Sequence, residues 1–222
     1  MGEFETIEAG GRTSRRYVAG RGATGVVVLH PWWGLNDDVI AYADGLAAAG
    51  FTVVAPDLFD GQVATTEEDA KRLARSADEE ALNAIVLATI DRLADRLGPD
   101  ATLGVVGFSF GAHWAMWSAA ERDRVAASVI YYGTTDGPYL AAARVPVLGH
   151  FADDDPFEAD EDVAAFEDTL ASAGREVTIH RYPDAGHWFA EPSRDAYRRE
   201  AAELAFERTV AFLNGEPAVT RT

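Results

Sequence analysis

The sequence predicts an α/β protein with a mainly parallel, doubly wound sheet that is covered by helices on both faces. Short apolar runs rich in β-branched residues alternate along the chain with longer segments of helical periodicity, which is the order of repeated strand–helix–strand units. The apolar runs are almost uninterrupted by polar residues, as in parallel strands that are buried on both faces. Because the 222-residue chain contains no linker, repeat or low-complexity tract, we expect a single domain spanning 1–222.

The predicted strands are spread over most of the chain. They are expected at 25–30, 51–57, 101–109, 125–133, 145–152 and 177–182, where apolar and β-branched residues cluster. The segment before residue 25 is a candidate for an additional, antiparallel strand at the edge of the sheet.

The predicted helices lie between these strands and after the last one, at 36–50, 67–97, 110–121, 160–174 and 194–215. The first has Asn36 or Asp37 as its candidate N-cap and ends at Gly50. The second is long enough to be two helices broken near 76–78, and Gly98-Pro99 is its stop signal.

The composition excludes several classes of function. Lys and Arg number 19 against 37 Asp and Glu, and the net charge of −18 disfavours binding to nucleic acid or to an anionic membrane. The absence of Cys rules out disulfides, thiolate metal sites and Cys nucleophiles. The chain has neither a signal-peptide core nor a run of about 18 apolar residues, so we expect a cytoplasmic protein.

Ser109 is the candidate nucleophile. It is the centre of the pentapeptide GFSFG, which joins a predicted buried strand to a predicted helix. A G-x-S-x-G sequence in this context is typical of a nucleophile elbow, a turn so sharp that only glycines can flank the serine. The alternative is a glycine-rich turn without chemistry.

A serine nucleophile needs a base, and in this topology the base follows the serine and the acid along the chain. Only His150, His180 and His187 follow Ser109. His150 and His180 lie within predicted strands, where a packed or surface histidine is the simpler interpretation. His187 lies in the polar loop segment YPDAGHWF, so we favour His187 as the base.

The acid is expected just after the strand at 145–152, where Asp153, Asp154 and Asp155 occur together. One of these carboxylates would orient the imidazole, although a solvated acidic turn is the alternative.

The oxyanion hole needs two backbone N–H groups. Phe110 supplies one, and Trp32 is the natural second donor because Pro31 has no N–H. Trp32 and the adjacent Trp33 would also form a wall of the pocket.

Five segments resemble the dienelactone hydrolase family, within the α/β-hydrolase superfamily. They are LHPWWGLN, GFTVVAPDLFDG, VVGFSFGA, LGHFADDDPF and YPDAGHWF, and the resemblance covers about residues 24 to 214. It implies an α/β-hydrolase fold without a large lid domain. It also implies Ser109 as nucleophile, His187 as base and Asp155 as acid, with Asp154 in reserve, and the amides of Trp32 and Phe110 as oxyanion donors.

The chain departs from the dienelactone enzymes of that family at three positions. Those enzymes use Cys where this chain has Ser109, and they carry a Glu that helps to activate the Cys where this chain has Pro31. They also place an Arg that binds the substrate carboxylate four residues after the histidine, where this chain has Glu191. We assign Trp33, Trp188 and Glu191 to the substrate pocket and expect Glu191 to disfavour an anionic substrate.

The sequence therefore predicts a serine hydrolase that cleaves carboxylic esters or lactones through an acyl-enzyme. Its expected partner is a small-molecule ester or lactone, and no cofactor or metal is expected. Hydrolysis of an anionic dienelactone, the activity of a carboxymethylenebutenolidase, is the first alternative. A non-catalytic α/β-hydrolase domain that binds a ligand in the same pocket is the second.

Overall fold

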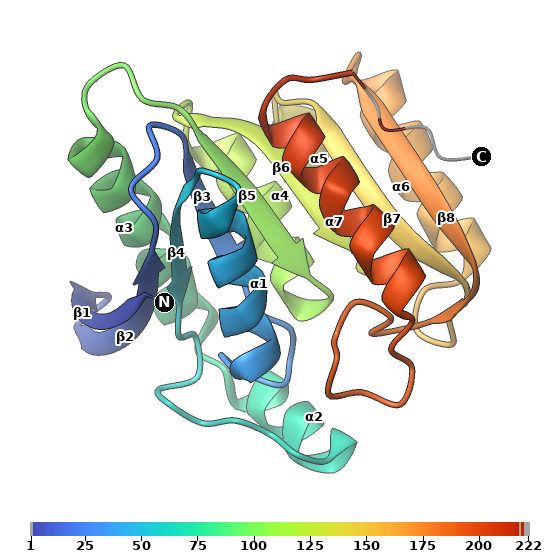
Figure 1. Ribbon diagram of the computed structural model, residues 1–222, viewed down its shortest axis with the longest axis horizontal. Helices are drawn as coiled ribbons and strands as arrows, with labels where there is room; N and C mark the ends of the chain where they lie inside the picture. The colour runs from blue at the N-terminus through green and yellow to red at the C-terminus, as the bar shows by residue number, and fades with distance from the viewer. Residues whose placement is uncertain (1, 218, 220–222) are drawn as a thin grey trace.

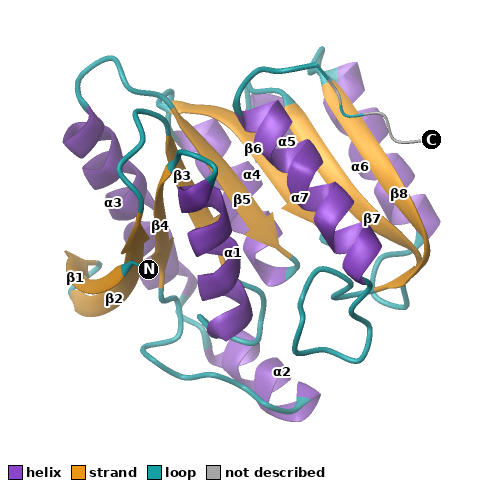
Figure 2. Cartoon of the chain, in the orientation of Figure 1, coloured by secondary structure: helices purple, strands orange, loops and turns teal. Residues whose placement is uncertain are grey.

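The computed structural model describes residues 2–217 and 219, and its centre is one eight-stranded sheet with the strand order β1-β2-β4-β3-β5-β6-β7-β8 (Figures 1 and 2). The strands are β1 (Glu3–Ala9), β2 (Arg12–Ala19), β3 (Gly25–Leu29), β4 (Thr52–Pro56), β5 (Leu103–Phe108), β6 (Val125–Tyr131), β7 (Val147–Asp154) and β8 (Val177–Gly186). From β4 to β8 in that order all neighbouring strands are parallel. The predicted doubly wound α/β sheet is confirmed.

The central strands are buried along their whole length. Every residue of β3, β4 and β5 is buried, which explains why the sequence shows uninterrupted apolar runs there rather than alternation. Helices on both faces exclude water from these strands.

The amino-terminal segment forms two strands, where the sequence indicated one edge strand as a candidate. β1 and β2 form an antiparallel hairpin, and β2 pairs antiparallel with β4. Gly10 and Gly11 make the turn with φ values of 57° and 72°, a conformation that glycine adopts without steric cost. Both strands are rich in charged residues because one side of this edge faces solvent.

The part of the chain that the structure describes contains seven helices: α1 (Asp37–Ala48), α2 (Glu67–Ser76), α3 (Glu79–Leu97), α4 (Phe110–Glu121), α5 (Pro138–Ala142), α6 (Asp160–Ser172) and α7 (Arg199–Leu213). Helices α1 and α7 lie on one face, and α3, α4 and α6 lie on the other (Figure 1). The two apolar cores divide in the same way, since one contains buried residues of α1 and α7 and the other those of α2 to α6. None of the described helices is long and apolar enough to cross a membrane.

The helix boundaries follow the capping signals. The Asn36 side chain accepts a hydrogen bond from the Val39 amide at 3.1 Å and caps α1. The predicted break near 76–78 is confirmed, because the Asp78 side chain accepts from the Ala81 amide at 3.2 Å and starts α3. A side-chain oxygen at an N-cap satisfies an amide that the helix itself leaves without a partner.

Two boundaries differ from the predictions by more than two residues. The last helix begins at Arg199 rather than at 194, because turns closed by hydrogen bonds from Arg194 to Glu191 and from Arg198 to Phe189 occupy the preceding residues. Strand β8 continues to Gly186, beyond the predicted end at 182. Helix α5 was not predicted, since five residues are too few to show a helical period.

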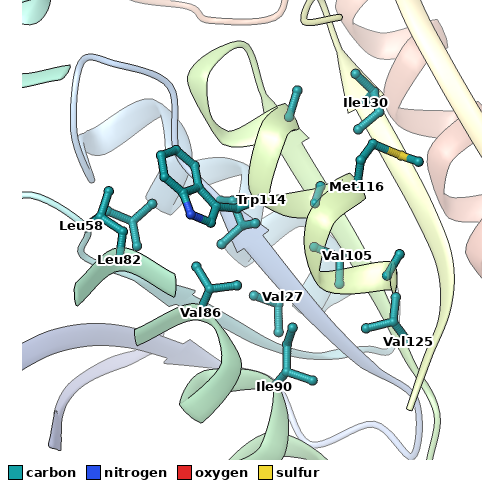
Figure 3. Packing of buried hydrophobic residues seen from close by; sticks show 14 of the residues in the cluster. Val27, Leu58, Leu82, Val86, Ile90, Val105, Trp114, Met116, Val125 and Ile130 are labelled. Carbon is teal, nitrogen blue, oxygen red and sulfur yellow. The ribbon is translucent and has the colours of Figure 1, made fainter. Parts of the chain in front are cut away.

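The larger core lies between the sheet and helices α3 and α4. Figure 3 shows Val86 and Ile90 of α3 beside Val27 of β3 and Leu82 of α3 beside Leu58, with Val105, Trp114 and Met116 in the same cluster. Ile90 is 0% exposed. This packing holds α3 and α4 against the sheet, and α4 is the helix that begins next to Ser109.

We expect Ile90→Ala to lower the free energy of unfolding by about 2–5 kcal/mol, because it removes buried methyl groups and leaves a cavity. Asp95→Ala, at an exposed position of the same helix, is expected to lower it by less than about 0.5 kcal/mol. Urea denaturation of the two variants measures the difference. Equal losses would contradict this description of the core.

Candidate active site

Ser109 occupies a sharp turn between β5 and α4, as the sequence predicts. Its backbone has φ 45° and ψ −109°, a conformation that side-chain-bearing residues rarely adopt and that costs on the order of 1–3 kcal/mol. A Cβ at Gly107 would clash with the backbone of Gly111, and one at Gly111 would clash with the carbonyl of Leu29. The two glycines therefore allow the strand, the turn and the helix to pack this tightly.

Ser109, His187 and Asp155 lie in contact although they are far apart in the sequence. The Ser109 hydroxyl is 3.0 Å from His187 Nε2, and His187 Nδ1 is 2.9 and 2.8 Å from the two carboxylate oxygens of Asp155. The side chains of His187 and Asp155 are only 4% and 2% exposed. The parallel strands β5, β7 and β8 end on the same side of the sheet and bring the three residues together (Figure 1).

The structure places Asp155, rather than Asp153 or Asp154, against the imidazole. Asp153 and Asp154 are the exposed last residues of β7. Asp155 comes one residue later, and its Oδ1 also accepts a hydrogen bond from the Phe157 amide at 2.9 Å. This second bond fixes the carboxylate in an orientation in which both of its oxygens face His187.

The two expected oxyanion donors lie on either side of the turn. Phe110 is the first residue of α4, so its amide is at the positive end of the helix dipole. Trp32 lies in the loop after β3, and the contact of Gly111 with Leu29 holds that loop close to the start of α4. Among the loop and turn hydrogen bonds of residues 2–217 and 219, neither amide donates to another backbone group.

Aromatic rings enclose the imidazole of His187. The ring centroids of Tyr132, Trp188 and Phe157 lie 5.0, 5.0 and 4.8 Å from it. Trp188 in turn packs edge-on against Trp33 at 5.2 Å. These contacts leave the imidazole little freedom to rotate away from Ser109.

A cavity of about 440 Å³ opens beside Ser109. Its other lining residues are Ala74, Ala77, Glu79, Phe110, His113, Trp114, Thr134 and Glu158. Ser109 and Phe110 are thus the predicted site residues that reach the cavity. Glu79, His113, Thr134 and Glu158 were not singled out from the sequence, since they belong to four separate segments that only the tertiary packing brings together.

The three residues assigned to the substrate pocket are not among those that line this cavity. Trp33 is 2% exposed and lies in the apolar core. Arg194 stacks over the Trp33 ring at 3.8 Å. Trp188 is half-buried against Trp33 and His187, and Glu191 is 2% exposed behind them. The structure groups them into a layer that supports the histidine.

The protonation state of Glu191 differs from the ionised carboxylate expected from the sequence. Its Oε1 accepts a hydrogen bond from the Tyr132 hydroxyl at 3.0 Å, while its buried Oε2 has no partner in the described part of the chain. Burial raises the pKa of Glu191 to about 8, although the Tyr132 bond and nearby Arg194 oppose the shift. Glu191 is therefore mostly protonated at neutral pH, and the expected charge repulsion of an anionic substrate does not arise from this residue.

The other two candidate histidines have structural roles. His150 is fully buried and contacts the Tyr182 hydroxyl at 2.8 Å and the Thr209 hydroxyl at 3.1 Å. Burial holds the pKa of His150 well below its ordinary value. His180 lies within β8, its ring stacked 5.9 Å from that of His150. In the part of the chain that the structure describes, the Ser109 hydroxyl contacts His187 and neither of these two histidines, which agrees with the packing interpretation drawn from the sequence.

The chain is similar to known proteins in sequence and in structure. The model of the dienelactone hydrolase family matches residues 15–216. "Protein usf" of Aquifex pyrophilus is 31% identical over 96% of this chain and 97% of its own length. A carboxymethylenebutenolidase of Rhodococcus opacus is 30% identical over 84% of this chain and 79% of its own. A crystal structure from Klebsiella pneumoniae subsp. pneumoniae MGH 78578 superimposes with a TM-score of 0.85 at 21% identity, covering 96% and 98% of the two chains.

Replacement of Glu191 tests its protonation. A carboxyl group whose pKa is raised on folding holds a proton that the unfolded chain releases, so it destabilises the fold increasingly as the pH rises from 4.5 toward 8. Glu191→Gln removes this penalty. We expect the free energy of unfolding of the variant to exceed that of the wild type at about pH 8, and the gap to narrow toward about pH 5.

Glu203→Gln, at an exposed position of α7, is the matched control and should show no such gap. Urea denaturation at the two pH values measures both variants. A gap that widens as the pH falls would mean that Glu191 is ionised in the folded protein.

Proposed function

The chain belongs to the dienelactone hydrolase family of hydrolases, and on that basis we propose that it cleaves small-molecule carboxylic esters or lactones by a serine mechanism. The observation that carries the proposal is the hydrogen-bonded series Ser109–His187–Asp155 at the wall of a cavity. A nucleophile, a base and a group that orients the base are the three parts that acyl transfer requires.

In the acylation step, the Ser109 oxygen attacks the carbonyl carbon of the ester while His187 Nε2 accepts the hydroxyl proton. The C=O electron pair moves onto the carbonyl oxygen to give a tetrahedral intermediate. When this intermediate collapses, the bond to the leaving oxygen breaks, and His187 gives its proton to that oxygen. The acyl group remains on Ser109, and the alcohol leaves. In a lactone the alcohol stays attached to the acyl group.

In the deacylation step, water takes the place of the alcohol. The water oxygen attacks the acyl carbon while His187 accepts a proton from the water. His187 then returns this proton to the Ser109 oxygen when the second tetrahedral intermediate collapses. The products are a carboxylic acid and the regenerated hydroxyl. Neither step involves a change of oxidation state, so the chemistry is complete with the groups named.

Asp155 and two backbone amides stabilise the charges that develop during the reaction. The Asp155 carboxylate accepts the Nδ1–H of His187, which leaves Nε2 free to accept the Ser109 proton, and it stabilises the imidazolium that forms. The amides of Trp32 and Phe110 would donate to the negative oxygen of each tetrahedral intermediate. The position of Phe110 at the start of α4 supports this role, because the helix dipole favours negative charge there.

Two other functions can be tested against this proposal. The Rhodococcus opacus relative is one of several that carry the name carboxymethylenebutenolidase, which favours an anionic lactone as substrate. Against this, the described lining of the cavity includes Glu79 and Glu158 and no Lys or Arg, so none of the lining residues offers a cation to a substrate carboxylate. A non-catalytic binding domain would have no need of the Ser109–His187 contact.

Ser109→Ala tests the nucleophile. The variant should fold normally and lose hydrolysis of para-nitrophenyl acetate by on the order of 10³-fold or more in kcat, because no atom remains to form the acyl-enzyme. A fluorophosphonate probe should label the wild type and not the variant, as read by intact-protein mass spectrometry. Retention of most activity would refute the assignment, and an unlabelled, inactive wild type would favour the binding domain.

Asp155→Asn tests the acid. We expect it to lower kcat by on the order of 10²-fold or more, because an amide at this position no longer enforces the tautomer of His187 that accepts the serine proton. Asp154→Asn is the matched control, since it removes the same charge from the adjacent, exposed residue. If Asp154→Asn were the more damaging change, the acid would be assigned to the wrong carboxylate.

A further inference from the structure

The lining of the cavity beside Ser109 combines aromatic rings with carboxylates. Phe110, His113 and Trp114 supply the rings, and neighbouring ring centroids among them are 4.6 and 4.9 Å apart. The Trp114 indole N–H already donates to Asn83 at 2.7 Å. His113 Nδ1 is likewise engaged, 3.0 Å from the Tyr139 hydroxyl. The wall therefore presents mainly aromatic ring surface to a ligand, and aromatic rings attract cations.

Glu158 is a half-buried carboxylate that lacks a cationic partner. The Thr134 amide and hydroxyl donate to its Oε2 at 2.8 and 2.6 Å. Within residues 2–217 and 219 it forms no ion pair. Burial raises the pKa of Glu158 despite these hydrogen bonds. A bound cation would supply the compensating charge that the protein itself does not provide.

The remaining charge around the cavity has the same sign. Glu79, an exposed residue at the start of α3, also lines it and takes part in none of the ion pairs of the described chain. Burial lowers the pKa of His113, so this histidine is neutral at neutral pH. The basic residues Lys71, Arg72 and Arg75 of the adjacent helix line a separate cavity, although the Lys71 ammonium, paired with Glu67, lies 5.6 Å from the centroid of the Trp32 ring.

From these observations we infer that the cavity beside Ser109 binds a cationic group of the substrate, so that esters or lactones carrying a substituted ammonium are preferred over neutral and anionic ones. This inference rests on the proposed function, because it places the cation beside the nucleophile. A metal ion is a poorer fit, since the described residues contain no group of three side chains that could ligate one. An organic cation needs only carboxylates and ring faces.

The test compares substrates of one shape and different charge. Acetylcholine and neohexyl acetate share the acetyl group and differ in having a trimethylammonium or a tert-butyl end, and acetoxypropane sulfonate supplies the anion. The para-nitrophenyl esters of trimethylammoniobutyrate and of its tert-butyl isostere place the same pair of groups on the acyl side. We expect kcat/KM to favour the cation by about tenfold or more in at least one pair, and to be lowest for the sulfonate.

Glu79→Gln and Glu158→Gln should each lower this ratio, and the double variant should lower it further. Glu80→Gln and Glu161→Gln are matched controls, because they remove the same charge from the first turns of α3 and α6 outside the cavity. Comparing each variant with the wild type cancels the intrinsic reactivity of the substrates. A wild type that hydrolyses the neutral esters without a cation preference, or a preference that both Gln variants retain, overturns the inference and leaves the proposed function intact.

A binding measurement separates the inference from the hydrolytic activity. Tetramethylammonium should bind to Ser109→Ala in calorimetric titration, and the affinity should fall by about tenfold or more when Glu79 and Glu158 are also replaced by Gln. If no ester is hydrolysed by the wild type, the proposed function fails and this titration alone decides the inference. Absence of binding to Ser109→Ala, or equal binding with and without the two carboxylates, overturns it.

Discussion

The close approach of helix α4 to the ends of three strands is the constraint on which the site depends. A side chain at Gly107, Gly111 or Gly133 would meet backbone atoms of the neighbouring element. Without these contacts the turn at Ser109 would open, and the serine would adopt a relaxed backbone conformation in place of φ 45°. The packing of α4 against the sheet therefore maintains the strain that projects the hydroxyl toward His187.

Behind the histidine, burial determines the acid–base behaviour of the groups that support it. Tyr132 lies between His187 and Glu191, with its ring against the imidazole and its hydroxyl on the carboxyl group. Because burial favours the neutral forms of both Tyr132 and Glu191, this layer places no second negative charge behind the imidazole at neutral pH. Asp155 is then the carboxylate that contacts the imidazole. Glu158, which follows Phe157 in the chain, lines the cavity instead.

Much of the fold and part of the site could be predicted from the sequence, because their signals are local. Strand β5, the turn at Ser109 and helix α4 are specified by adjacent residues, and the structure has α4 at the predicted 110–121. The local pattern left the choice among three successive aspartates open and only the family resemblance favoured Asp155, since the β7–β8 pairing shifts register between Ala152 and Asp154. The wall of the cavity could not be predicted, because Glu79 and Glu158 have no local pattern and meet only through the packing of distant segments. Trp33 and Trp188 follow the expected motifs but serve as packing around the histidine rather than as cavity lining.

The separation of the site residues along the chain has a consequence for folding kinetics. The Ser109–His187 contact spans 78 positions and the Asp155–His187 contact spans 32. Neither contact can form until β5, β6, β7 and β8 have paired in parallel, and such non-local pairing is slow because loop closure precedes the gain from contacts. During refolding, secondary structure should thus return well before the ability to form an acyl-enzyme. In the proposed mechanism the serine would become nucleophilic only in molecules whose strand β8 has joined the sheet, and an incompletely folded chain would not hydrolyse esters.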